Sequence, residues 1–308
     1  MVKRYRQFFR SDADGLRISA LSICPEEMPY KGVIQLVHGM SEHKERYEPF
    51  MEYMASFGYV AVIHDHRGHG QSVRSGDDLG YMYGGGADAM LADIASVNRQ
   101  IREKFPDLPL ILMGHSMGSL AVRAFAAEHD DCMDMLIVCG SPSNRRARIA
   151  GSVIAKLEGK LFGMRHSRLL EILSFGNYAA RFSGEKNRNA WICSDPEVYQ
   201  AYTDSELCGF TFTDDAYLAL FQLMKRAYDV KHWNCTKPEL PVLFISGSDD
   251  PCLGNVRQFA AAVQKMRDAG YRDVKGKLYP GMRHEILNEK DRERVFRDIS
   301  VYIRKKGF

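Results

Sequence analysis

Ser116 occupies the centre of the pentapeptide Gly-His-Ser-Met-Gly at residues 114–118, which follows an apolar run and precedes a segment of helical periodicity. A serine on so sharp a strand-to-helix turn exposes its hydroxyl, and glycines two positions away on either side relieve the crowding. The helix that follows directs its N-terminal amides to the same point, where they stabilise developing negative charge. The pentapeptide alone is equally consistent with a plain tight turn, so a nucleophile at Ser116 requires partner residues.

A serine hydroxyl becomes a good nucleophile only when an adjacent base takes its proton and an acid orients that base. In this strand-to-helix arrangement the acid follows a later strand, and a histidine base follows the last one. Of the histidines beyond Ser116, at positions 129, 166, 232 and 284, only His284 follows the last apolar run and precedes the last helical segment. Asp249 and Asp250 directly follow another apolar run, and either one could orient His284 while the other caps a helix or forms a turn.

The tetrahedral intermediate of acyl transfer carries an oxyanion that needs two hydrogen-bond donors, usually backbone amides. One comes from the residue after the nucleophile, here Met117, and the other comes from the loop after an earlier strand. That loop is the segment HGMSEH at residues 38–43, in which Gly39 allows a close approach and Met40 is the predicted donor. The alternative interpretation of this segment is an ordinary turn.

Short, unbroken apolar runs supply the strands that would position these residues. They lie at residues 31–39, 59–66, 108–116, 133–141 and 240–248, and such runs are typical of strands buried on both faces. Helical periodicity occupies residues 46–57, 88–105 and 117–129, and a helix near 256–269, a strand near 274–279 and a helix near 289–306 complete the pattern. This alternation predicts an α/β fold with a mostly parallel central sheet and helices on both faces.

The alternation stops between Ser141 and Pro241, over far more chain than a strand-to-strand crossover needs. Apolar residues recur at helical spacing within residues 148–175 and again within 216–230. We interpret this insertion as a helical cap over the edge of the sheet, with extra helical core as the alternative. The predicted organisation is a core of residues 1–140 and 239–308 and a cap of residues 141–238.

The first part of the predicted cap is strongly basic, with one acid, Glu158, among many cations. The basic side chains between residues 145 and 168 are Arg145, Arg146, Arg148, Lys156, Lys160, Arg165 and Arg168. Amphipathic cationic segments of this kind are used by helices that rest on anionic lipid surfaces. The hypothesis is peripheral contact of the cap with a membrane or micelle, and the alternative is a solvated helix face.

Bulk composition bounds the remaining possibilities. With 308 residues, 45% of them apolar and 26% charged, and a net charge of +3, the chain resembles a soluble single-domain protein, and nothing global indicates a nucleic-acid partner. The N-terminus lacks the apolar segment of a secretory signal. No apolar run approaches the roughly 20 residues that cross a bilayer. The cysteines include no Cys-x-x-Cys pair. We therefore expect a cytoplasmic protein with reduced thiols. Composition makes no prediction of the oligomeric state.

A second cluster with chemical potential contains His64, Asp65, His66 and His69, because imidazole and carboxylate groups bind metal ions. The spacing of this cluster fits no zinc signature, and we interpret the segment as a structural loop beside the site. No metal and no organic cofactor is expected for the chemistry at Ser116.

Five segments together resemble the monoacylglycerol lipase and lysophospholipase branch of the α/β-hydrolase family. They are HGMSEHKERYEPF at 38–50, DHRGHGQS at 65–72, GHSMGS at 114–119, GSDDP at 247–251 and YPGMRHE at 279–285. Their order and spacing match from about residue 5 to the end, and Ser119 stands where many members of that family have a second glycine.

This resemblance implies Ser116 as the nucleophile, Asp250 as the acid, His284 as the base, and the backbone amides of Met40 and Met117 as oxyanion donors. It implies a serine carboxylester hydrolase that cleaves the acyl ester of a monoacylglycerol or a lysophospholipid through an acyl-enzyme. The alternatives are a thioesterase or an aminopeptidase with the same triad, or a non-catalytic binding protein of the same fold. The basic cap disfavours the aminopeptidase, because the free amine of its substrate calls for carboxylates.

Overall fold

The computed structural model describes residues 2–144, 147–162 and 165–308. Its centre is an eight-stranded sheet with the strand order β1-β2-β4-β3-β5-β6-β7-β8. The strands are β1 (Val2–Arg10), β2 (Arg17–Pro25), β3 (Gly32–Val37), β4 (Tyr59–His64), β5 (Leu110–His115), β6 (Met135–Cys139), β7 (Val242–Gly247) and β8 (Val274–Tyr279). From β4 to β8 every neighbouring pair is parallel, which confirms the predicted mostly parallel α/β sheet.

The antiparallel edge formed by β1 and β2 lies outside the predicted apolar runs. β1 pairs with β2 along its whole length, from Val2 opposite Pro25 to Arg10 opposite Arg17, and β2 continues antiparallel onto β4. The side chains of β1 are largely exposed, and several of them are Lys or Arg. Charged edge strands discourage pairing with other chains, and they lack the apolar signal by which the central strands are found.

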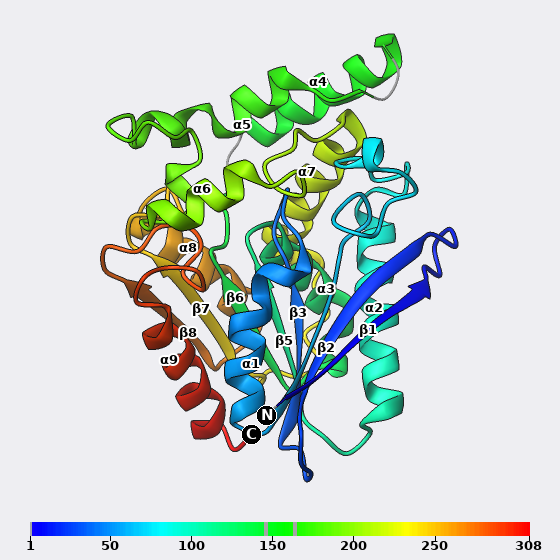
Figure 1. Ribbon diagram of the computed structural model, residues 1–308, viewed down its shortest axis with the longest axis vertical. Coiled ribbons are helices and arrows are strands. Elements are labelled where there is room, and N and C mark those ends of the chain that lie inside the picture. Colours follow the sequence, from blue (N-terminus) through cyan, green and yellow to red (C-terminus); the bar gives the residue numbers. More distant parts are fainter. Residues whose placement is uncertain (1, 145–146, 163–164) are drawn as a thin grey trace.

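Helices cover both faces of the sheet (Figure 1). The helices of the core are α1 (Glu48–Ser56), α2 (Gly86–Lys104), α3 (Met117–His129), α8 (Val256–Asp268) and α9 (Arg292–Lys305). Val33 and Val37 of β3 pack in the same cluster as α2, α3 and α8, whereas Ile34 and Leu36 pack in the cluster of α1 and α9. Because alternate side chains of a strand enter two different cores, the central strands read as continuous apolar runs.

In the part of the chain between β6 and β7 that the structure describes, there are four further α-helices. They are α4 (Ala147–Phe162), α5 (Arg168–Arg181), α6 (Pro196–Asp204) and α7 (Asp214–Tyr228). α4 and α5 lie above the carboxyl ends of the parallel strands (Figure 1), whereas α7 packs against α3 and its apolar residues join the larger core cluster. The division of the chain into a core and a cap at residues 141–238 stays a prediction.

Short 3-10 helices complete the connections. They are η1 (Lys44–Tyr47), η2 (Gly76–Asp78), η3 (Asp130–Cys132), η4 (Ala190–Ile192) and η5 (Val230–His232). Among the described residues, no helix combines the length and the apolarity needed to span a bilayer.

Candidate active site

Ser116 lies at the corner between β5 and α3, with a backbone φ of +53° that few residues other than glycine adopt. A Cβ atom at Gly114 would collide with the carbonyl group of Gly118, and one at Gly118 would collide with the carbonyl group of Val37. The glycines at both positions are therefore required by the close contacts of this turn, as the pentapeptide predicts. The turn holds Ser116 at the carboxyl end of β5, where its side chain faces a cavity.

The structure brings Ser116, His284 and Asp250 together from three separate loops. The Nε2 atom of His284 lies 2.8 Å from Oγ of Ser116, and its Nδ1 atom lies 3.0 Å from Oδ2 of Asp250. Asp249 is exposed, and its carboxylate accepts a hydrogen bond from the hydroxyl of Ser248 instead. Of the two candidate acids, only Asp250 contacts His284.

The carboxylate of Asp250 is completely buried, and three groups bond to it. Besides His284, the hydroxyl of Ser246 and the backbone amide of Cys252 donate to it, at 2.9 Å and 2.7 Å. Burial by itself would raise the pKa of this carboxyl, but the charge of His284 and these hydrogen bonds hold the pKa below its usual value. Asp250 is therefore ionised at neutral pH and suited to stabilise a protonated imidazole.

The predicted oxyanion donors flank the serine. Met117 is the first residue of α3, and Met40 follows Gly39 in the loop after β3, and both line the same cavity as Ser116. A Cβ atom at Gly39 would lie 3.1 Å from Cβ of Ser116, so the loop approaches the serine as closely as a glycine permits.

A buried carboxylate, Glu42, holds this loop in place. It accepts hydrogen bonds from the backbone amide of Gly39 at 2.6 Å, from the hydroxyl of Tyr47 at 2.9 Å and from the guanidinium of Arg46 at 2.7 Å. Burial opposes ionisation of Glu42, but His115, whose Nδ1 atom lies 3.3 Å away, and Arg46 keep its pKa well below the usual value. Sequence reasoning did not assign a role to Glu42, although it lies within the quoted HGMSEH segment.

Ser41 connects the same loop to the chain between β6 and β7. Its backbone has a φ of +53°. Its hydroxyl donates a hydrogen bond to the carbonyl oxygen of Phe210 at 2.7 Å. Its own carbonyl oxygen accepts hydrogen bonds from the amide of Gly209 and the hydroxyl of Tyr202, both at 2.9 Å. Its amide donates to Nε2 of His69 at 3.2 Å. Ser41 thus joins the loop that carries Met40 to the chain between β6 and β7 through hydrogen bonds to Phe210, Gly209 and Tyr202.

Two of the histidines considered as metal ligands, His66 and His69, contact this loop. Nε2 of His38 accepts a hydrogen bond from the amide of His66, and Nε2 of His66 lies 3.0 Å from the carbonyl oxygen of His38. Burial lowers the pKa of His66 to about 4 and that of His69 to about 3, so both are neutral at pH 7. Neutral imidazoles can accept from backbone amides, as His38 and His69 do here.

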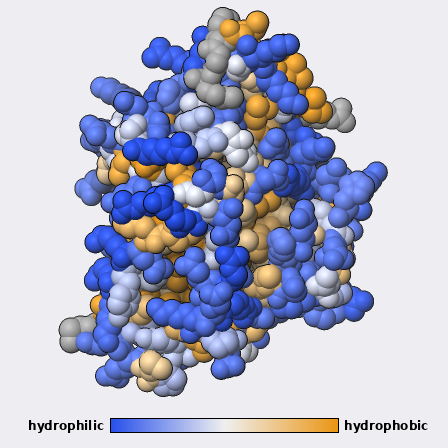
Figure 2. Space-filling view, turned by 90° about the vertical axis from the view of Figure 1, so that its right-hand side faces the viewer, coloured by the Kyte–Doolittle hydropathy of each residue, from blue (hydrophilic) through white to orange (hydrophobic). Residues whose placement is uncertain are grey.

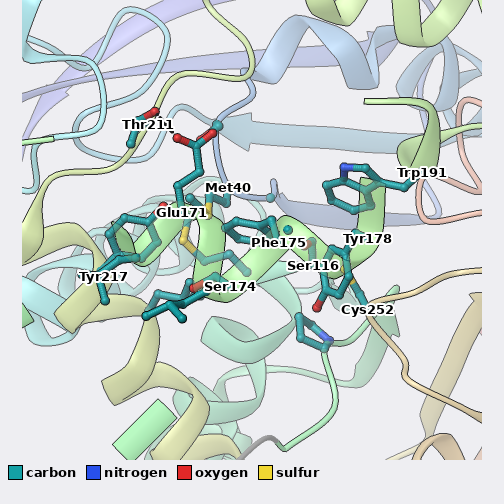
Figure 3. A pocket seen from close by; sticks show the side chains of 18 of the residues that line it. Met40, Ser116, Glu171, Ser174, Phe175, Tyr178, Trp191, Thr211, Tyr217 and Cys252 are labelled. Carbon is teal, nitrogen blue, oxygen red and sulfur yellow. Dashed lines mark hydrogen bonds between the residues drawn. The ribbon is translucent and has the colours of Figure 1, made fainter. Parts of the chain in front are cut away.

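The cavity in front of Ser116 has a volume of about 910 Å³ and is walled mainly by α4, α5 and α7 (Figure 3). The ring of Trp191 lies 5.2 Å from that of His284, and it packs against Tyr178 and Phe175 of α5. Trp191 of η4 and the two rings of α5 thus form an aromatic wall beside Ser116 and His284. A cavity of this size and character suits an apolar chain with a few polar contacts.

The outer surface of α4 and α5 is unusually apolar for a region in contact with solvent. Large hydrophobic side chains that are at least 48% exposed there are Ile149, Val153, Leu157, Leu161, Leu169, Ile172 and Leu173. Figure 2 shows hydrophobic residues at the top of the molecule, at the height of these helices. Of the basic side chains predicted in this region, Arg145 and Arg146 lie outside the described residues.

The strand order, the turn at Ser116 and the contacts of His284 define an α/β-hydrolase fold with a serine elbow. Residues 28–291 match the model of a protein family described as serine aminopeptidase S33, and the chain belongs to this family. This confirms the resemblance found in the sequence.

Several relatives are named as lipases. The chain is 32% identical over 279 residues to the monoglyceride lipase of Mus musculus, covering 90% of this chain and 83% of the relative. It is 25% identical over 302 residues to the monoacylglycerol lipase of Mycolicibacterium smegmatis, covering 94% and 93%. Among solved structures, a thermostable carboxyl esterase from Bacillus coagulans in complex with glycerol superposes with a TM-score of 0.89 at 26% identity, covering 98% of both chains.

Proposed function

We propose that this chain is a serine carboxylester hydrolase and that Ser116 is its nucleophile. The observation that carries the proposal is the unbroken chain of contacts from Ser116 through His284 to Asp250, at 2.8 Å and 3.0 Å. His284 takes the proton of Ser116 as the hydroxyl attacks the acyl carbonyl carbon, and it returns that proton to the leaving alcohol. The resulting acyl-enzyme is hydrolysed by a water that His284 activates, while the amides of Met40 and Met117 stabilise each oxyanion.

The proposed substrate is the acyl ester of a lipid-like alcohol, a monoacylglycerol or a lysophospholipid. The apolar character of the 910 Å³ cavity supports an acyl chain, and relatives that match most of the chain are named monoacylglycerol or monoglyceride lipase. In this proposal residues 141–238 form a cap that selects the substrate, and residues 1–140 and 239–308 form the catalytic core.

Two measurements test the nucleophile. Ser116→Ala is expected to abolish turnover of a nitrophenyl acyl ester and labelling by a fluorophosphonate probe. Ser152→Ala is the matched control, because the hydroxyl of Ser152 on α4 bonds only to the backbone of its own helix in the described contacts. Turnover retained by Ser116→Ala would refute the assignment, and a wild-type chain that resists the probe would favour a non-catalytic binding protein.

The same triad serves thioesters and amides, so the leaving group must be tested separately. An aminopeptidase needs a carboxylate for the free amine of its substrate, and Glu171 lines the cavity. Because the guanidinium of Arg188 lies 3.9 Å from Glu171 and its charge weakens the attraction for a cationic amine, we favour an ester over an aminoacyl amide. Rates on an acyl glycerol, an acyl thioester and an aminoacyl amide of equal length decide among the three.

We also propose that α4 and α5 contact a lipid surface. The exposed apolar side chains of the two helices alternate with cations such as Lys156 and Lys160, which fits an anionic interface. Vesicles containing anionic lipid are expected to co-sediment the protein better than neutral vesicles. Equal binding to both, or binding unchanged by charge reversal at Arg145, Arg146 and Arg148, would argue against this contact.

A further inference from the structure

A polar patch interrupts the apolar wall of the cavity at a distance from the triad. It contains Tyr217 of α7, Glu171 of α5 and Thr211, all of which line the same cavity as Ser116. Figure 3 shows these three side chains grouped together on the opposite side of Phe175 from Ser116. The patch therefore lies where part of a bound substrate other than its ester group would reach.

Within this patch, the hydroxyl of Tyr217 has no hydrogen-bond partner among the described residues, and its side chain is fully buried. Burial and the negative charge of Glu171 raise the pKa of this phenol well above its usual value, so the hydroxyl keeps its proton at neutral pH. A buried hydroxyl without a partner is costly, and such groups commonly mark the place of a water or a ligand.

The carboxylate of Glu171 is only partly engaged. Its Oε2 atom accepts from the hydroxyl of Thr211 at 2.7 Å, and its Oε1 atom lies 3.9 Å from the guanidinium of Arg188, a side chain that is 67% exposed. Glu171 therefore keeps capacity to accept a further hydrogen bond from inside the cavity.

A group that satisfies both residues must accept a hydrogen bond from Tyr217 and donate one to Glu171. A hydroxyl does both, whereas an ammonium group only donates and a phosphate or carboxylate only accepts. Glu171 also repels an anion, and Arg188 weakens the attraction for a cation. We propose that Tyr217, Glu171 and Thr211 form a subsite that binds a hydroxyl group of the substrate, remote from the scissile ester.

This inference rests on the proposed ester hydrolase activity and deepens it. The hydroxyl has two possible sources, the acyl chain or the alcohol portion of the ester. Two kinds of matched pair distinguish these sources. The first compares a methyl hydroxydecanoate, with the hydroxyl at carbon 6, 8 or 10, with methyl decanoate. The second compares glycerol monodecanoate with propyl decanoate.

In the wild-type chain one pair is expected to show about a tenfold higher kcat/KM for the hydroxylated member, because the hydrogen bonds made in the subsite replace those that the hydroxyl made to water. Tyr217→Phe keeps the ring and removes only the hydroxyl, so it is expected to lower this preference to about twofold or less. Tyr302→Phe removes another buried hydroxyl that has no partner among the described residues, on α9 and outside the cavity, and is expected to leave the preference intact.

Equilibrium binding separates this proposal from the catalytic one. Calorimetry on Ser116→Ala, with and without Tyr217→Phe, measures affinity for the same esters without turnover. A hydroxyl preference in binding supports the subsite even if no ester is hydrolysed, in which case only the proposed reaction fails. Equal affinities and equal rates within both pairs, or a preference that survives Tyr217→Phe, would overturn the subsite and leave the patch to water.

Discussion

The two sides of the cavity differ in how their buried polar groups are hydrogen-bonded and in how much apolar surface they expose. On the core side, Glu42 and Asp250 are buried carboxylates that each accept several hydrogen bonds at 2.6–3.0 Å. On the cap side, the hydroxyl of Tyr217 lacks a partner among the described residues, and residues such as Leu161 and Ile172 expose apolar surface to solvent. Directional hydrogen bonds fix atoms in position, whereas apolar walls tolerate change. The comparison supports the proposal that residues 1–140 and 239–308 specify the reaction and that residues 141–238 select the substrate.

The largest effect is expected from breaking the core side at its acid. Asp250→Asn removes the charge that orients and stabilises His284, and kcat for a nitrophenyl ester is expected to fall by about 10⁴. Asp249→Asn is the matched control in the adjacent position, and because Asp249 is exposed its kcat is expected to stay within about twofold of wild type. Equal losses in the two variants would contradict the assignment of Asp250.

The next largest effect concerns the loop that carries Met40. Glu42→Gln removes the charge that pairs with Arg46 and holds the amide of Gly39, so the oxyanion donor shifts and kcat is expected to fall by about 10² with little change in KM. Glu52→Gln, on the surface of α1, is the control. A rise in KM at constant kcat would show that Glu42 acts on binding instead.

A fall in pH is expected to lower the free energy of unfolding, because the folded chain keeps buried histidines such as His66 neutral. In the unfolded chain His66 takes up a proton near pH 6.5, whereas in the folded chain its pKa is about 4, so the unfolded state binds more protons between these values. Stability is therefore full above pH 6.5 and is lost as the pH falls toward 4, by about 3 kcal/mol from His66 alone. Urea unfolding at pH 7.5, 6.0 and 4.5 measures this loss, and a free energy of unfolding that stays constant would contradict it.

The smallest effect is expected where the two sides meet. Tyr202→Phe removes one hydrogen bond from the carbonyl oxygen of Ser41, and kcat is expected to fall about fivefold, the equivalent of one neutral hydrogen bond. Tyr228→Phe removes a similar bond, to the carbonyl oxygen of Pro142, without touching the loop of Met40. Equal kcat values in the two variants would show that the cap does not act through Ser41.

The sequence predicts the central strands and the residues around Ser116 better than the chain between β6 and β7, and the reasons are physical. The central strands and the turn at Ser116 are visible because local apolar runs and nearby glycines encode them. His284 is found by its place after the last strand, whereas the choice of Asp250 over Asp249 needs either a family resemblance or the three-dimensional contact. Helices α8 and α9 are confirmed to within a few residues of the predicted boundaries.

What escapes the sequence is encoded by contacts between distant residues. Ser41 bonds to Phe210, 169 positions away, and no local pattern indicates that pairing. The short helix α6 was not predicted. The hydroxyl of Tyr217, which has no partner among the described residues, belongs to an apolar stretch that the sequence alone presents as ordinary core. Strand β1 was missed because an exposed basic edge carries no apolar signal, whereas β2 is largely buried but its serines interrupt the apolar run.

The position of the proposed cap in the chain determines how an insertion affects the sheet. β6 and β7 are neighbours in the sheet, with Cys139 opposite Ile245, although residues 140–241 separate them in sequence. The entropy of closing a flexible loop grows only with the logarithm of its length, so doubling such an insertion costs about 0.6 kcal/mol. Segments of different length and composition can therefore be exchanged at this single junction while the sheet keeps its register.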